Sequence, residues 1–158
     1  MTSRLALLGF AIDGLRICVG NETRQPMIRR NALAVLGLLY AAASLIHFAH
    51  NAEYLNAYPN LPAWLTQYEV YGAWLCITAI GVLGYTLHHR GRTMPGLLLI
   101  GVYAAIGLDG LLHYGRAPFA DHTAAMNATI QFEVALAACL LLTVATLIVP
   151  HVKTKGTP

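Results

Sequence analysis

Four long apolar runs, separated by short polar stretches, dominate the pattern of residues along this chain of 158 residues. They lie at residues 31–54, 67–87, 95–114 and 123–149. Each has about 20 residues or more, which is the length that an α-helix needs to cross the hydrocarbon core of a bilayer. The pattern therefore predicts an all-α integral membrane protein, built as a bundle of four transmembrane helices.

The first 26 residues follow a different pattern. Their apolar side chains recur at steps of three and four residues, while Asp13 and Arg16 interrupt them; the apolar positions are Leu5, Leu8, Ile12, Leu15 and Val19. Such spacing predicts a short amphipathic helix in the membrane interface. An alternative is that translation begins at Met27. In both cases we expect the four-helix domain to occupy residues 27–158.

Composition and charge support a membrane protein. Hydrophobic residues make up 57% of the chain and charged residues only 11%, whereas soluble domains carry about 25% charged residues. The basic residues near the ends of the runs fall on one side, except for Arg116; they are Arg24, Arg29, Arg30, Arg90, Arg92, Lys153 and Lys155. Because cytoplasmic loops are rich in Lys and Arg, we expect a multi-pass protein of the cell membrane with both termini in the cytoplasm. The scattered cations do not form a nucleic-acid-binding face.

Ionisable residues interrupt the apolar runs at one level. His47 and His50 lie near the end of the first run, Asp109 and His113 near the end of the third, and Glu133 lies about three turns into the fourth. All of them belong to the outer third of the bundle if the predicted orientation holds. Polar groups in a membrane-spanning helix face other protein rather than lipid. We therefore expect these residues to form one site.

The residue types at this level favour a transition metal. His47 and His50 are spaced i,i+3 and Asp109 and His113 i,i+4, so each pair shares a helical face. Facing helices with such pairs build metal sites inside bundles, and imidazole with carboxylate suits copper, zinc or iron. The predicted ligands are His47, His50, Asp109, His113 and His122. This predicts a membrane oxidoreductase or a metal-handling component.

Several other functions fit the same residues. Two of the histidines would serve as axial ligands in a haem-binding electron carrier. Glu133 and Asp109 would act as catalytic acid and base on a lipophilic small molecule in an isomerase-like enzyme that needs no metal. A polar stripe would also line the path of a small transporter or channel subunit, working as a homo-oligomer or within a membrane complex. The residues alone do not choose among these functions.

Overall fold

A computed structural model describes residues 31–153 of the chain, with side chains through residue 149. The chain divides into two units, Met1–Ala34 and Val35–Pro158. In the first unit the described residues, 31–34, are helical. The predicted amphipathic helix and the predicted boundary after residue 26 lie outside the described residues. The arrangement given below is that of the second unit.

Four helices are long and apolar enough to cross a membrane: Asn31–Glu53, Gln67–His89, Thr93–Arg116 and Ala124–Val149. We call the helix Asn31–Glu53 the first span. The second helix is α2, Gln67–His89, and the fourth belongs to α5, Ala124–Lys153. The described residues contain no strand. The all-helical, four-span pattern is thereby confirmed, with bounds close to the predicted ones, while membrane insertion and orientation remain predictions.

The third helix is not wound uniformly along its length. It consists of α3, Thr93–Ile106, a 3-10 stretch η2, Gly107–Leu111, and a short helix α4, Leu112–Arg116. A further 3-10 turn, η3, Phe119–Asp121, leads into α5. The sequence pattern had predicted one regular helix here, and the change to 3-10 winding was not foreseen.

Short signals in the sequence set the ends of α2. Thr66 and Glu69 form a capping box at its start, since the Glu69 carboxylate accepts from the Thr66 backbone N–H at 2.7 Å and the Thr66 hydroxyl accepts from the Glu69 N–H at 3.4 Å. At the other end, Gly91 turns the chain into α3 with a φ of 82°, a value that favours glycine. Both signals are local, and neither was needed to predict this helix from its apolar run.

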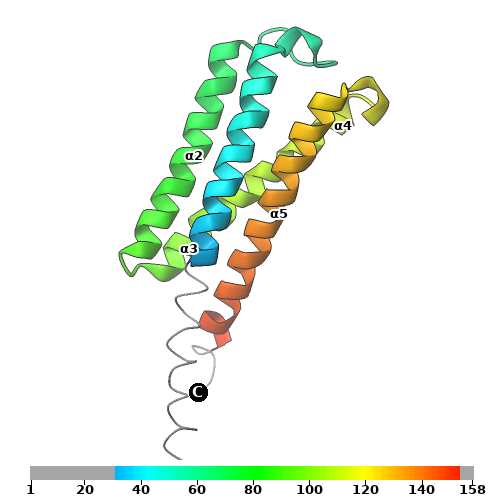
Figure 1. Cartoon of the computed structure of the whole chain (residues 1–158). Helices are drawn as coiled ribbons and strands as arrows, with labels where there is room; N and C mark the ends of the chain where they lie inside the picture. The colour runs from blue at the N-terminus through cyan, green and yellow to red at the C-terminus, as the bar shows by residue number, and fades with distance from the viewer. Residues whose placement is uncertain (1–30, 154–158) are drawn as a thin grey trace, which may run out of the picture. The chain divides into compact units, whose positions relative to one another are not determined.

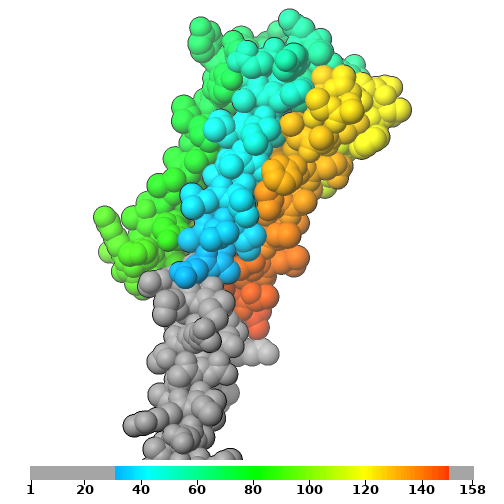
Figure 2. Space-filling model, in the orientation of Figure 1, coloured from blue at the N-terminus to red at the C-terminus, as the bar shows by residue number. Residues whose placement is uncertain are grey.

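Glycines bring α2 and α3 close together. A Cβ atom on Gly96 would lie 2.5 Å from the His88 nitrogen, and one on Gly84 would lie 2.9 Å from the Ile100 nitrogen. α3 packs against both α2 and α5, whereas η2 packs against α5 (Figure 1). Figure 2 shows the first span lying between α2 and α5 on one face. The third helix thus leaves α2 as it passes from α3 into η2 and α4.

Two glycines allow η2 to lie close to its neighbours. A Cβ atom on Gly107 would collide with the Tyr40 hydroxyl of the first span, and one on Gly110 would lie 3.3 Å from Val134 of α5. We call the end of the bundle where the first span ends and α2 begins the His end. There, η2 and α4 diverge from α2, and the loop of residues 54–66, which contains the 3-10 turn η1, Leu55–Ala57, crosses the opening.

Candidate functional site

A buried imidazole and a buried carboxyl group meet in the core near the His end. His47 is 3% exposed and Glu133 is 0% exposed, and His47 Nε2 lies 3.6 Å from Glu133 Oε2. The other ring nitrogen of His47, Nδ1, lies 3.4 Å from the Thr129 hydroxyl on α5. Both nitrogens of His47 are therefore directed into the bundle, toward α5.

His113 on α4 lies beside this pair. Its ring centroid is 5.4 Å from that of His47 and 6.2 Å from that of His122. Its Nε2 atom lies 3.3 Å from the Asn51 side-chain nitrogen on the first span. Among the described residues no hydrogen bond is recorded for its Nδ1 atom, so one edge of this imidazole is left for a ligand.

His50 faces a different partner. Its Nδ1 atom lies 2.9 Å from the Tyr58 hydroxyl in the loop that covers the His end. Burial raises the pKa of this hydroxyl to about 12, so Tyr58 keeps its proton at any physiological pH. The Tyr58 ring also lies 5.2 Å from the His113 ring, centroid to centroid. Tyr58 therefore links two of the predicted histidines.

Asn127 on α5 holds His122 in place. Its side-chain amide donates to the carbonyl groups of Phe119 and His122, at 3.1 and 3.3 Å, and accepts from the Tyr114 hydroxyl at 3.0 Å. His122 is 6% exposed, its Nδ1 atom lies 3.0 Å from the Pro118 carbonyl oxygen, and its Nε2 atom has no partner within the described residues. His122, a loop residue, is thus held beside His113.

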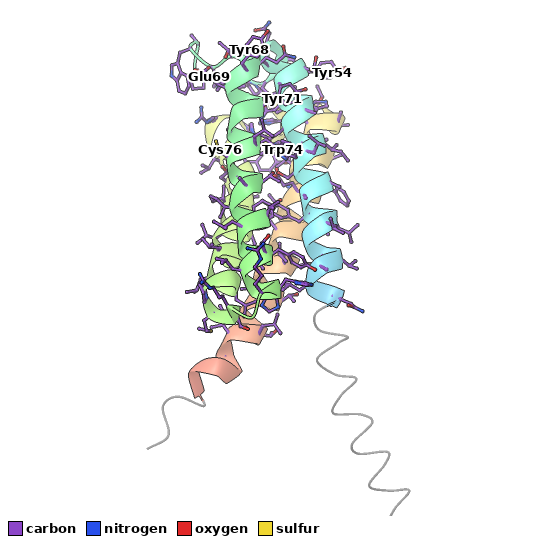
Figure 3. The ribbon with its side chains drawn as sticks, turned by 90° about the vertical axis from the view of Figure 1, so that its left-hand side faces the viewer. Tyr54, Tyr68, Glu69, Tyr71, Trp74 and Cys76 are labelled. Atoms are coloured by element: carbon purple, nitrogen blue, oxygen red, sulfur yellow. The ribbon has the colours of Figure 1, made fainter. Side chains whose placement is uncertain are left out.

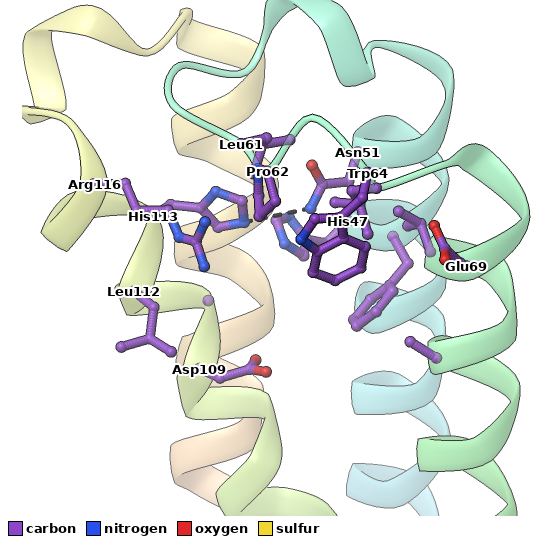
Figure 4. A pocket seen from close by; sticks show the side chains of 15 residues that line it. His47, Asn51, Leu61, Pro62, Trp64, Glu69, Asp109, Leu112, His113 and Arg116 are labelled. Carbon is purple, nitrogen blue, oxygen red and sulfur yellow. Dashed lines mark hydrogen bonds between the residues drawn. The ribbon is translucent and has the colours of Figure 1, made fainter.

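A pocket of about 260 Å³ opens at this level between α2 and the η2–α4 segment (Figure 4). His47 and His113 form part of its wall, and Trp64 of the loop, 70% exposed, lies over it. The remaining wall is mostly apolar, with Phe48, Leu61, Pro62, Leu65, Val70, Ala73 and Leu112 among its residues. The pocket exists because the third helix moves away from α2 where it becomes η2.

Asp109 lines this pocket but is not buried beside His47 and Glu133. It lies on η2, lines the pocket and is exposed. A 3-10 stretch has 3.0 residues per turn instead of 3.6, so the steps from Asp109 to the end of η2 at Leu111 turn the chain further than an α-helix would. Asp109 and His113 are therefore not related as in one regular α-helix, although both line the pocket.

Two other carboxylates near the His end, Glu53 and Glu69, have structural partners. Glu53 accepts from the Gln67 amide at 2.7 Å and from the Tyr71 hydroxyl at 2.9 Å, joining the first span to α2. Glu69 caps α2 and lines the edge of the pocket. Figure 3 shows Tyr54, Tyr68 and Glu69 at this end, with Trp74 further along α2.

The structure brings together His47, His113, His122 and Glu133, with His50 joined through Tyr58. Among residues 31–153, no group of three or more His, Cys, Asp and Glu side chains is arranged to hold a metal ion, so the predicted metal stays a prediction. Sequence analysis missed Tyr58 and Thr129. The sequence offers only weak signals for them. Tyr58 is a tyrosine just before Pro59 in the loop, and Thr129 carries a hydroxyl one helical turn before Glu133.

Comparisons with protein-family models, with curated proteins and with solved structures found no match to this chain.

Proposed function

We propose that this chain is a multi-pass membrane protein that takes a small lipophilic molecule into the pocket and exchanges protons with it. The observation that carries the proposal is a mostly apolar pocket whose wall includes the two imidazoles of His47 and His113 and the carboxylate of Asp109. Asn51, Glu69 and Arg116 also line it. Binding sites for small molecules are mostly apolar with a few convergent polar groups. The pocket opens between two helices of membrane-spanning length, and a lipophilic ligand would reach it from the bilayer.

The polar groups would have separate roles. His113 offers the free edge of its ring and Asp109 offers a carboxyl group from the same segment, so one would donate a proton while the other accepts one. An acid and a base beside one ligand are what an isomerisation needs. Glu133 lies behind His47 and does not line the pocket, so it would act through His47 as a positioning residue and not on the ligand itself.

Photolabelling tests binding. Wild type in lipid nanodiscs is exposed to a long-chain alcohol that carries a diazirine in its alkyl chain. Ala73→Trp places an indole in the pocket, whereas Ala79→Trp makes the same change at an exposed position of α2 outside the pocket. We expect labelling of pocket residues to fall several-fold in Ala73→Trp alone. Equal labelling in both variants would show that the alcohol does not bind in the pocket.

Proton exchange needs its own measurement. Lipophilic molecules extracted from the membranes of the producing cells are incubated with the protein in deuterated buffer, and their deuterium content is measured by mass spectrometry. We expect deuterium to enter one molecular species with wild type, with or without a chelator, and not with His113→Phe. Loss of deuterium incorporation in the presence of chelator would show that proton exchange needs a metal.

A transition-metal site is the second candidate. The observation that favours it is the succession of His47, His113 and His122 rings, with an unpartnered buried Nε2 atom on His122. The ring nitrogens would have to turn toward a common point to bind copper, zinc or iron. Elemental analysis of wild type, His47→Ala and His113→Ala decides this, since one metal per chain that both variants lose would establish a shared site. An absorption spectrum of the same samples tests the haem alternative.

A further inference from the structure

Arg116, the last residue of α4, brings a permanent positive charge to the wall of the pocket. Among the described residues, no ion pair between its side chain and a carboxylate is recorded. The other Lys and Arg residues of the described chain lie at the opposite end of the bundle, with Arg90 and Arg92 between α2 and α3 and Lys153 at the end of α5. Within residues 31–153, Arg116 is thus the only Lys or Arg at the His end.

The loop that crosses the His end holds the main chain at Arg116. The Asn60 side-chain amide donates to the Arg116 carbonyl oxygen at 2.8 Å. Asn60 has a φ of 57°, a left-handed conformation that asparagine adopts more readily than most residues. The Ala117 N–H donates to the His113 carbonyl oxygen at 3.1 Å and closes the last turn of α4. These contacts fix the segment from which the Arg116 side chain reaches the pocket wall beside His113 (Figure 4).

The free edge of His113 is a hydrogen-bond donor. The Asn51 side-chain nitrogen, 3.3 Å from His113 Nε2, belongs to an amide NH₂ group, which only donates. Nε2 therefore accepts, and the proton of the neutral ring is on Nδ1. His113 and Arg116 are spaced i,i+3 on α4, so their side chains share a face. Two donor groups, one of them cationic, thus lie on the same side of the pocket.

The carboxylates of the pocket wall leave this side free for an anion. The Glu69 carboxylate accepts from the Thr66 backbone N–H at 2.7 Å and from the Thr66 hydroxyl at 3.0 Å, which holds it at the start of α2. Asp109 lies on η2, further from the loop than Arg116 (Figure 4). A negatively charged group beside Arg116 would therefore meet donors rather than a second anion.

The size of the pocket restricts the rest of the ligand. Its volume of about 260 Å³ is below the range of about 300–1,000 Å³ that is usual for ligand pockets. Phe48, Leu65 and Val70 give it an apolar wall. The volume and the wall favour a ligand with one hydrocarbon chain over a phospholipid with two.

We propose that the pocket takes a single-chain lipophilic molecule with an acidic head group, a carboxylate or a phosphate, and that Arg116 and His113 Nδ1 bind this head group. A guanidinium group forms paired hydrogen bonds with either anion, and charge-assisted hydrogen bonds of this kind are stronger than neutral ones. The inference rests on the proposed function, because it names the class of ligand for the same pocket.

Photolabelling with three probes of equal chain length tests the head group. The probes are a long-chain alcohol, carboxylic acid and monophosphate, each with a diazirine in its alkyl chain, in mildly alkaline buffer that ionises both acids. Arg116→Gln is compared in nanodiscs with wild type and with Arg92→Gln, the matched control at an exposed arginine of the opposite end. In wild type and Arg92→Gln, we expect half-maximal labelling of pocket residues at a several-fold lower mole fraction of acid than of alcohol. Arg116→Gln should lose this advantage and keep labelling by the alcohol.

The outcomes separate the head group from the pocket. An advantage for one acid alone would support the inference and identify the head group. Equal labelling by the alcohol and both acids in wild type would overturn the inference but not the proposed function. Loss of the advantage in Arg92→Gln as well, or labelling by the acids that persists in Ala73→Trp, would also overturn it. Failure of all three probes to label pocket residues would overturn the proposed function too.

A conservative variant provides a second measurement. Arg116→Lys keeps the positive charge at the end of α4 but lacks the planar guanidinium. We expect it to keep part of the advantage of the acids, and complete loss of the advantage in a folded Arg116→Lys would contradict an electrostatic role. Circular dichroism of each variant confirms that it folds.

Discussion

Close packing of α2 on α3 makes Gly96 the position where one methyl group should do most damage. A Cβ atom there would lie 2.5 Å from the His88 nitrogen and 2.8 Å from the Gly84 carbonyl oxygen. Both are backbone atoms, so no side-chain rotation can relieve the overlap. Gly96→Ala therefore forces α2 and α3 apart. The contact lies near the end of α2 at His88, away from the pocket, so the change tests the packing of the bundle and not the pocket wall.

The expected magnitude follows from two opposed effects. Overpacking of a close contact costs about 1–3 kcal/mol, and replacement of glycine by alanine within a helix returns about 0.8–1 kcal/mol. Gly101→Ala, on the same helix, gains the same helix preference but meets only Val144, at an ordinary 3.4 Å. The two variants should therefore differ by about 1–3 kcal/mol in the free energy of unfolding, which is roughly a five- to 150-fold difference in the unfolding equilibrium constant.

Titration with a denaturing detergent in mixed micelles, followed by circular dichroism, measures both free energies under the same conditions. We expect Gly101→Ala to equal or exceed wild type and Gly96→Ala to fall below it. If the two variants unfold together, the close approach of α2 and α3 at Gly96 is wrong.

Two further predictions concern the residues that hold the His end together. Asn127→Ala removes three hydrogen bonds, each worth about 0.5–1.5 kcal/mol. In the same titration it should therefore lower the free energy of unfolding several times more than Gln131→Ala, which removes one exposed hydrogen bond to Tyr114. Equal losses in the two variants would contradict the placement of His122. Because burial raises the pKa of Tyr58 from 10 to about 12, the folded state holds this proton where the unfolded state releases it, and stability should fall as pH rises from 10 to 12. Between pH 10 and 12, the free energy of unfolding should fall less steeply in Tyr58→Phe than in Tyr68→Phe, which changes an exposed tyrosine. Identical slopes in the two variants would show that Tyr58 is not buried.

The four helices could be predicted because their signal is local. Long apolar runs, the capping box at Thr66 and the glycine turn at Gly91 each act within a few residues. The 3-10 winding of η2 could not be predicted in this way. It accompanies contacts of Gly107 with Tyr40 and of Gly110 with Val134, which join segments far apart in the sequence.

The candidate site was predictable in part. Shared depth alone predicted that His47, His113 and Glu133 would meet, and the structure brings these side chains together. The regular helical spacing assumed for Asp109 and His113 does not hold, because η2 is wound as a 3-10 helix as far as Leu111.

Nitrogen NMR of 15N-histidine-labelled protein in nanodiscs tests most directly whether His113 presents a free imidazole edge to a lipophilic ligand in the pocket. The chain has seven histidines, and the His113 resonances are assigned by their loss in His113→Phe. On addition of the long-chain alcohol probe, we expect the His113 Nδ1 resonance to shift in wild type and in Ala79→Trp, and to stay in place in Ala73→Trp. A His113 resonance that does not respond in wild type, while the probe still labels the pocket, would contradict this role of His113.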